Sequence, residues 1–158
     1  MRLFFALWPP AETAAALHGW AGQLPGRATR TESIHVTLAF LGEADAAKAS
    51  AAARRVQGRK HDLPIERAEY WKHNQIVWVG PQETPPPLAL LVHELQNELK
   101  KDGFTLEDRP FAAHVTLLRK APRPPALPEL PRVAWPVTEL RLVASQGGYR
   151  TLETFQLR

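Results

Sequence analysis

The 158-residue chain contains no cysteine, and this absence removes several kinds of chemistry. Disulfide bonds, thiolate metal sites and cysteine nucleophiles are all excluded. No apolar run reaches the roughly 18 residues that a membrane span needs, so we expect no transmembrane helix. The opening run MRLFFALWPP meets two prolines where a signal peptide would need a longer apolar core and a cleavage site. A reducing compartment is allowed though not required, and we expect the cytoplasm.

The overall composition is that of a compact globular protein. Hydrophobic residues make up 44% of the chain and charged residues 23%, which argues against a disordered or fibrous protein. The length falls in the range of one domain. Lys and Arg number 20 against 16 Asp and Glu, and the net charge of +4 favours an anionic partner without identifying one.

Apolar periodicity predicts strands and helices in a mixed order. Alternation and short apolar runs predict strands at 2–8, 34–41, 63–70, 75–79, 112–118, 137–144 and 149–157. Helical spacing, with prolines or Asp45 suited to the first turns, predicts helices at 10–24, 45–57 and 84–101. Residues 119–136 contain six prolines and three arginines, which predicts an exposed loop.

The tetrapeptide HVTL occurs twice, at 35–38 and at 114–117, a separation of 79 positions (114 − 35). The surrounding elements also match in order, so that residues 2–41 form an imperfect repeat with 75–118. The repeat is too long for a solenoid unit. It predicts one two-lobed domain over residues 1–158, with the lobes related by a pseudo-twofold axis.

Strand alternation places the polar residues of each copy on one face. Side chains two apart in a strand point the same way, so His35 and Thr37 share a face, as do His114 and Thr116. The pseudo-twofold axis would bring the two faces together across the groove between the lobes.

Two facing histidines with neighbouring threonines suit phosphoryl chemistry. One imidazole can remove a proton from water while the other, protonated, gives a proton to the leaving oxygen, because histidine titrates near neutral pH. Each threonine hydroxyl can donate to a nonbridging phosphate oxygen. Such a reaction requires neither a metal nor a nucleotide cofactor.

Most of the other histidines and tryptophans fit structural positions. A single His-x-Thr on a strand is ordinary, because threonine favours strands, but two copies in the same register are not. The other histidines lack metal-ligand spacing and fit solvated positions: His18, His61, His73 and His93. Trp8, Trp20 and Trp78 are expected in the core. Trp71, in a polar turn, either packs at the rim or stacks on a base.

The segments HVTLAFLG and HVTLLRKA, with the opening strand RLFFAL, resemble the motifs of a known family. They are similar to the two His-x-Thr-x motifs and first strand of the bacterial and archaeal RNA 2′,3′-cyclic phosphodiesterases. These proteins are also called 2′-5′ RNA ligases and belong to the two-histidine phosphoesterase superfamily. The resemblance covers nearly the whole chain, including GFTLEDRPFAAHVTLLR, IVWVG and VTELRLVASQGGYRTLETFQLR.

The resemblance implies a bilobal, duplicated α+β fold in which two antiparallel sheets line a central cleft and helices lie outside. It implies hydrolysis of terminal RNA 2′,3′-cyclic phosphates to 2′-phosphomonoesters without metal or ATP. His35 would donate a proton to the 3′ oxygen and His114 would accept one from water. Thr37, Thr116 and Arg119 would bind the phosphate. The expected partners are RNA ends or nucleotides with a cyclic phosphate, tRNA fragments among them, and we expect a monomer.

Phe40 and Arg119 stand five residues after the two histidines, an odd step that strict alternation would turn away from the cleft. A strand end or a bulge could re-aim them. Arg119 is long enough to reach back to a phosphate, whereas Phe40 is expected to pack in the core. Two other functions stay open: an RNA-end or nucleotide-binding module with little turnover, and the reverse reaction that seals 2′-5′ linkages.

Overall fold

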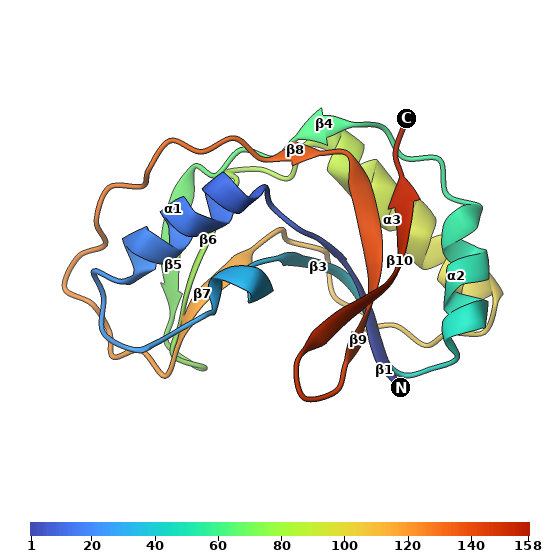
Figure 1. Ribbon diagram of the computed structural model, residues 1–158, viewed down its shortest axis with the longest axis horizontal. Helices are drawn as coiled ribbons and strands as arrows, with labels where there is room; N and C mark the ends of the chain where they lie inside the picture. The colour runs from blue at the N-terminus through green and yellow to red at the C-terminus, as the bar shows by residue number, and fades with distance from the viewer.

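The computed structural model describes residues 1–158 and contains two four-stranded antiparallel sheets (Figure 1). The first sheet has the order β10-β9-β1-β3 and the second has the order β2-β7-β6-β5. The first comprises β1 (Arg2–Leu7), β3 (Val36–Glu43), β9 (Glu139–Ser145) and β10 (Tyr149–Gln156). The second comprises β2 (Arg27–Ala28), β5 (Arg67–Trp71), β6 (Ile76–Gly80) and β7 (Val115–Arg119). A two-stranded ladder joins β4 (His61–Asp62) to β8 (Pro136–Val137).

Three helices lie outside the sheets, at Ala11–Ala21 (α1), Ala46–Arg54 (α2) and Pro86–Lys101 (α3). Helix α1 follows β1 in the chain but contacts β7 of the second sheet, and α3 follows β6 but contacts β3 of the first. Each of these helices therefore covers the sheet that does not contain the strand before it, as Figure 1 shows. No helix combines the length and apolar character needed to cross a membrane. The α+β fold with two antiparallel sheets is confirmed.

Local chemistry accounts for where the helices begin. The Asp45 carboxylate accepts a hydrogen bond from the backbone N–H of Ala47 at 2.9 Å, which caps α2. Helix α3 begins at Pro86, where a missing N–H costs nothing because the first turn has no partner for it. Its buried face follows the predicted stripe, formed by Leu88, Leu91, Val92, Leu95 and Leu99.

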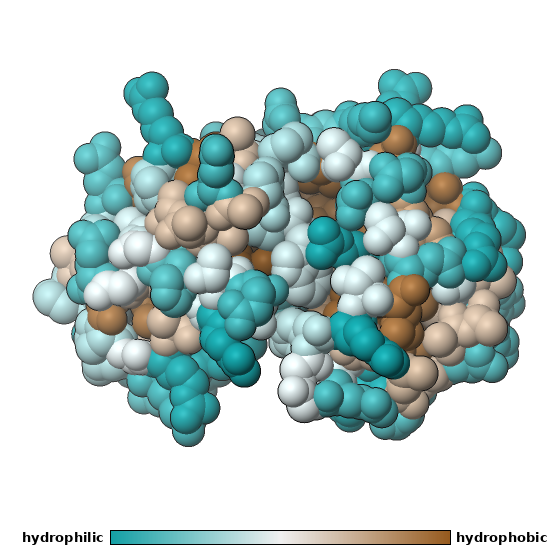
Figure 2. Space-filling view, in the orientation of Figure 1, coloured by the Kyte–Doolittle hydropathy of each residue, from teal (hydrophilic) through white to brown (hydrophobic).

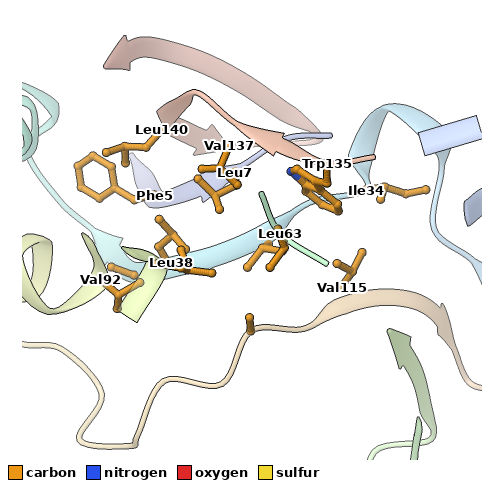
Figure 3. Packing of buried hydrophobic residues seen from close by; sticks show 14 of the residues in the cluster. Phe5, Leu7, Ile34, Leu38, Leu63, Val92, Val115, Trp135, Val137 and Leu140 are labelled. Carbon is orange, nitrogen blue, oxygen red and sulfur yellow. The ribbon is translucent and has the colours of Figure 1, made fainter. Parts of the chain in front are cut away.

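One cluster of 33 buried hydrophobic residues draws on both sheets. Figure 3 shows Phe5 and Leu38 of the first sheet in the same packed region as Val115 of the second. The outer surface is mostly hydrophilic, and an indentation separates the two halves of the molecule in Figure 2. A shared core fixes the position of one sheet against the other.

Two predicted segments differ in the structure. The strand expected at 63–70 is interrupted, because Pro64 has no N–H to give to a ladder, and β4 and β5 lie on either side of it. The proline-rich stretch after β7 is a loop as predicted, but its end is not exposed. Trp135 is only 1% exposed, and its carbonyl accepts a hydrogen bond from the N–H of Leu63 at 2.9 Å.

Candidate active site

The two predicted histidines line one cavity of about 270 Å³ between the sheets. His35 comes directly before β3 and His114 directly before β7, at the matching position of each half. Thr37 and Thr116, two residues further along each strand, line the same cavity. The structure therefore brings together the four residues that the duplicated motif singled out.

Both imidazole rings are held in the same way. Nδ1 of His35 lies 2.6 Å from the carbonyl oxygen of Ser33, and Nδ1 of His114 lies 3.1 Å from the carbonyl oxygen of Ala112. A carbonyl only accepts, so each Nδ1 carries a proton that it donates to the residue two before it. The neutral ring then has an unprotonated Nε2, and Nε2 is the atom left for proton transfer.

The threonine hydroxyls complete the polar wall. Oγ1 of Thr37 lies 3.1 Å from Nε2 of His35, within hydrogen-bond distance. Thr29, which follows β2, donates from Oγ1 to the backbone oxygen of Thr116 at 2.9 Å and also lines the cavity. This bond ties the residue after β2 to β7, the strand that follows His114.

Each motif strand contains a β-bulge at the leucine of HVTL. Two consecutive residues of β1 pair with Ala39 and Thr37 of β3, so Leu38 has no partner. Two consecutive residues of β6 likewise pair with Leu118 and Thr116 of β7, so Leu117 has no partner. Leu38 and Leu117 are thus the extra residues. A bulge shifts the alternation by one, so the side chains beyond it change face.

The bulges overturn one prediction and supply the geometry for another. Phe40, expected in the core, is 44% exposed and lines the cavity, with the Arg2 guanidinium 5.3 Å from its ring centroid. Strict alternation was the wrong rule for it because Leu38 is skipped in the pairing. Arg119, beyond the second bulge, is exposed and also lines the cavity.

Three aromatic rings surround His35, and the sequence did not reveal their role. Trp8 stacks on the imidazole with ring centroids 4.8 Å apart and planes at 14°, whereas Phe4 and Tyr149 each lie 5.3 Å away. Trp8, predicted as core, is only half-buried. Phe4 and Ala6 of β1 lie on the face of the sheet that carries Trp8. The sequence does not identify this face, because the strand is apolar at almost every position.

His114 packs against two tryptophans instead. Trp71 lies edge-on at 4.9 Å and Trp78 at 6.1 Å, both at steep interplanar angles. Trp78 is buried, as predicted. Trp71 is half-buried and lines a second cavity of about 510 Å³, which shares Phe40, His114 and other residues with the first.

The environment of His35 lowers its pKa below the ordinary value of 6.5. Burial is the largest cause, because it penalises the charged imidazolium. The hydrogen bond to Ser33 acts in the opposite direction and raises the pKa, while electrostatic repulsion from Arg119 and His114 lowers it further.

The remaining histidines are not catalytic candidates on this geometry. His18, His61 and His93 line neither cavity, and His73 lies at the second cavity with its ring 6.1 Å from Trp71. The chain has no group of three or more His, Asp or Glu side chains that could hold a metal ion.

Known proteins resemble this chain over nearly its whole length. A model of the 2'-5' RNA ligase superfamily matches residues 8–148. The RNA 2',3'-cyclic phosphodiesterase of Escherichia coli K12 is 36% identical over 153 residues, covering 91% of this chain and 86% of the relative. The protein of that name from Thermus thermophilus is 32% identical and covers 100% of this chain and 91% of its own length.

The fold agrees with solved structures as well. The structure of E. coli LigT in its apo form has a TM-score of 0.90 at 32% sequence identity, covering 99% of this chain and 96% of that one. LigT complexed with 3'-AMP gives a TM-score of 0.89 at 31% identity, covering 99% and 97%. Because the family model and these relatives span almost all of the sequence, this chain belongs to the 2'-5' RNA ligase superfamily.

Proposed function

We propose that this chain hydrolyses the 2′,3′-cyclic phosphate at RNA ends to a 2′-phosphomonoester. One observation carries the proposal. Two histidines in equivalent positions donate from Nδ1 to the carbonyl two residues before them, so that both Nε2 atoms are left for chemistry in one cavity. Acid and base catalysis by opposed imidazoles needs this arrangement.

The proposed reaction has two coupled proton transfers. His114 accepts a proton from water through Nε2 as the water oxygen bonds to phosphorus. The bond from phosphorus to the 3′ oxygen breaks, and His35 gives the proton on its Nε2 to that oxygen. The products are a free 3′ hydroxyl and a 2′-phosphomonoester, and the next cycle requires the two histidines to exchange their protons with water. No metal or nucleotide cofactor enters this sequence.

Thr37, Thr116 and Arg119 are proposed to bind the nonbridging phosphate oxygens. All three line the cavity that contains the histidines. Hydroxyl donors and a guanidinium that are already in position stabilise the charge that gathers on these oxygens in the transition state. Arg119 is the only one of the three with a formal positive charge.

The lowered pKa of His35 is compatible with its role as proton donor once substrate binds. In the free protein His35 is neutral at pH 7, because burial and electrostatic repulsion from the nearby basic side chains oppose protonation. An anionic phosphate in the cavity raises the pKa of a neighbouring imidazole, since opposite charge stabilises the protonated form. Substrate binding would therefore favour the protonated form of His35, which can then give its Nε2 proton to the leaving oxygen.

The relatives support the same function. Three curated relatives are named RNA 2',3'-cyclic phosphodiesterase, and such an enzyme is a hydrolase. Structures of E. coli LigT are described as complexed with 3'-AMP and with phosphate. We further propose that residues 1–158 act as one two-lobed catalytic domain, descended from a repeat of about 2–41 and 75–118.

The test uses an oligoribonucleotide that ends in a 2′,3′-cyclic phosphate, incubated in excess EDTA. We expect conversion to a 2′-phosphate end, and a loss of about 10²–10⁴ in kcat for His35→Ala and for His114→Ala. Circular dichroism of each variant checks that the fold survives. An intact cyclic phosphate after long incubation, with tight binding of the oligomer, would instead indicate an RNA-end binding module.

The superfamily name gives a specific reason to examine 2′-5′ ligation as well, in which an RNA 5′ hydroxyl takes the place of water. Attack of a 5′ hydroxyl on the cyclic phosphate would use the same two histidines with the donor and acceptor roles retained. Because water competes with a dilute RNA hydroxyl, we propose hydrolysis as the main activity and 2′-5′ ligation as a side activity. Product analysis of two RNA fragments with matching ends measures the ratio directly.

A further inference from the structure

Two arginines lie directly opposite each other at the edge of the active site. Arg27 of β2 pairs with Arg119 of β7, and Ala28 pairs with Leu118 in the next row. Leu118 is buried and Ala28 packs against the core. Because neighbouring rows of a ladder face opposite ways, Arg27 lies on the same face as Arg119, the face of the catalytic cavity.

This pairing is unfavourable for the sheet itself. Like charges directly opposite on neighbouring strands destabilise the ladder. Neither arginine forms an ion pair with a carboxylate. Both belong to segments without any Asp or Glu, residues 13–31 and 109–128. The positive charge at this edge is therefore not neutralised by the protein.

The backbone holds the two arginines in fixed positions. Gly26, directly before Arg27, has φ +130°, and a Cβ there would lie 3.1 Å from Cα of Ala121 and 3.2 Å from the Arg119 carbonyl oxygen. Only glycine combines that φ with so close an approach. Lys120, directly after Arg119, also has a left-handed backbone with φ 50°. The backbone conformations of Gly26 and Lys120 thus fix the chain next to each arginine at this end of the ladder.

We propose that Arg27, which lies beside Arg119 on the next strand, binds the RNA backbone phosphate on the 5′ side of the terminal nucleoside, while Arg119 binds the cyclic phosphate. This inference rests on the proposed function, because it extends the substrate of that same site. Arg119 reaches the cavity where the cyclic phosphate would lie, and Arg27 lies one strand further out, about 4.8 Å away in the sheet. Arg27 itself lines neither cavity.

The inferred subsite makes the protein an enzyme of RNA chains rather than of single nucleotides. A nucleoside 2′,3′-cyclic phosphate has only the cyclic phosphate, whereas a longer RNA also has a backbone phosphate that Arg27 could bind. Charged hydrogen bonds to a phosphate give affinity in the chain substrate alone. Arg27 would therefore set the preference between the two classes of substrate.

The experiment compares kcat/KM on a trinucleotide ending in a 2′,3′-cyclic phosphate with kcat/KM on adenosine 2′,3′-cyclic phosphate. For Arg27→Gln we expect about a tenfold loss on the trinucleotide and less than about a twofold change on the mononucleoside. Arg27→Lys, which retains the charge without the planar fork, should fall between. The salt dependence of the trinucleotide reaction should become shallower by about 0.7 in log–log slope.

Arg59→Gln is the matched control, because Arg59 is exposed, lines neither cavity and changes the net charge equally. Equal losses on both substrates, or no loss on either, would overturn the subsite. Failure of hydrolysis itself is separated by equilibrium binding, which compares a trinucleotide with a 3′-phosphate against adenosine 3′-phosphate. Unchanged binding of the trinucleotide by Arg27→Gln would also overturn the subsite, whatever the turnover.

Discussion

The two histidines are alike in their hydrogen bonds and unlike in their surroundings. Carbonyl oxygens of Ser33 and Ala112 fix the same tautomer in both rings. Around His35 a stacked Trp8 ring helps to exclude water, whereas His114 is approached edge-on by Trp71. Burial also lowers the pKa of His35. Their different environments permit different roles in one reaction.

A substrate with sulfur in place of the bridging 3′ oxygen tests these roles. A thiolate leaves without a proton, because a thiol has a pKa of about 8.5, far below that of an alcohol. His35→Ala should lose about 10²–10⁴ in kcat on the oxygen substrate but less than about tenfold on the sulfur substrate. His114→Ala should lose as much on both. The opposite pattern in steady-state kinetics would exchange the donor and the acceptor.

The lowered pKa of His35 also predicts how stability depends on pH. The unfolded chain protonates this residue at its ordinary pKa of 6.5, and the folded chain protonates it only at lower pH. The unfolded state therefore binds more protons between the two values. The contribution of neutral His35 is fully present above pH 6.5 and is lost as pH falls through its folded pKa.

Urea unfolding at pH 7.5 and pH 5.0 measures this effect. The free energy of unfolding of the parent protein should be lower at pH 5.0 than at pH 7.5. The difference should be smaller in His35→Gln, whose side chain cannot titrate. An equal fall in the His35 variant would mean that His35 titrates alike in the folded and unfolded chain.

At the scale of the secondary-structure elements, helix α3 supports the sheet that carries His35. Leu95 is fully buried on its inner face, and Leu90 is 54% exposed on its outer face. Leu95→Ala should lower the free energy of unfolding by about 2–5 kcal/mol, because it removes packed methyl groups and leaves a cavity. Leu90→Ala, the same substitution on the same helix, should change it by less than about 0.5 kcal/mol. Chemical denaturation of both variants provides the comparison.

Sequence periodicity predicted most of the elements because their signals are local. The stripe of α3 and the alternation before Leu38 are legible within a few residues. The bulges cannot be predicted in this way, because a leucine at a bulge looks the same in the sequence as a leucine in a regular strand. For this reason Phe40 was placed in the core although it lines the cavity.

The residues of the site were predictable to the extent that they recur. His35 and His114 stood out because the same four letters appear in both halves. Trp8 and Tyr149 occur once each in the site, and their contacts with His35 join strands β1 and β10 to the motif across the fold. Such contacts depend on tertiary pairing, which no local pattern in a single sequence reports.

At the scale of the whole molecule, the lobes are built from exchanged parts. Strand β2 comes from the first half of the chain but pairs with β7, and the hairpin of β9 and β10 comes from the second half but pairs with β1. One core cluster includes residues of both sheets. Neither sheet is therefore complete without the other half of the chain.

This exchange predicts a single unfolding transition. Three of the five tryptophans, Trp20, Trp71 and Trp78, belong to the second sheet or to the helix that covers it, so fluorescence is weighted toward that sheet. Far-UV circular dichroism reports largely on helices, of which α3 is the longest and lies on the first sheet. The two signals should change at the same urea concentration, and the calorimetric and van't Hoff enthalpies should agree. Leu95→Ala should shift both signals together. Two separated transitions would show that the lobes are independent folding units.

The paired bulges at Leu38 and Leu117 have a consequence for how a substrate is seated. They bring the fifth residue after each histidine into the cavity, and those residues are a phenylalanine on one side and an arginine on the other. The backbone is duplicated there, but the chemistry is not. A ligand with a charged end and a flat aromatic end thus meets two unequal walls. Phe40 and Arg119 therefore make the two sides of a nearly symmetric cleft different, and a bound substrate can be oriented in one direction.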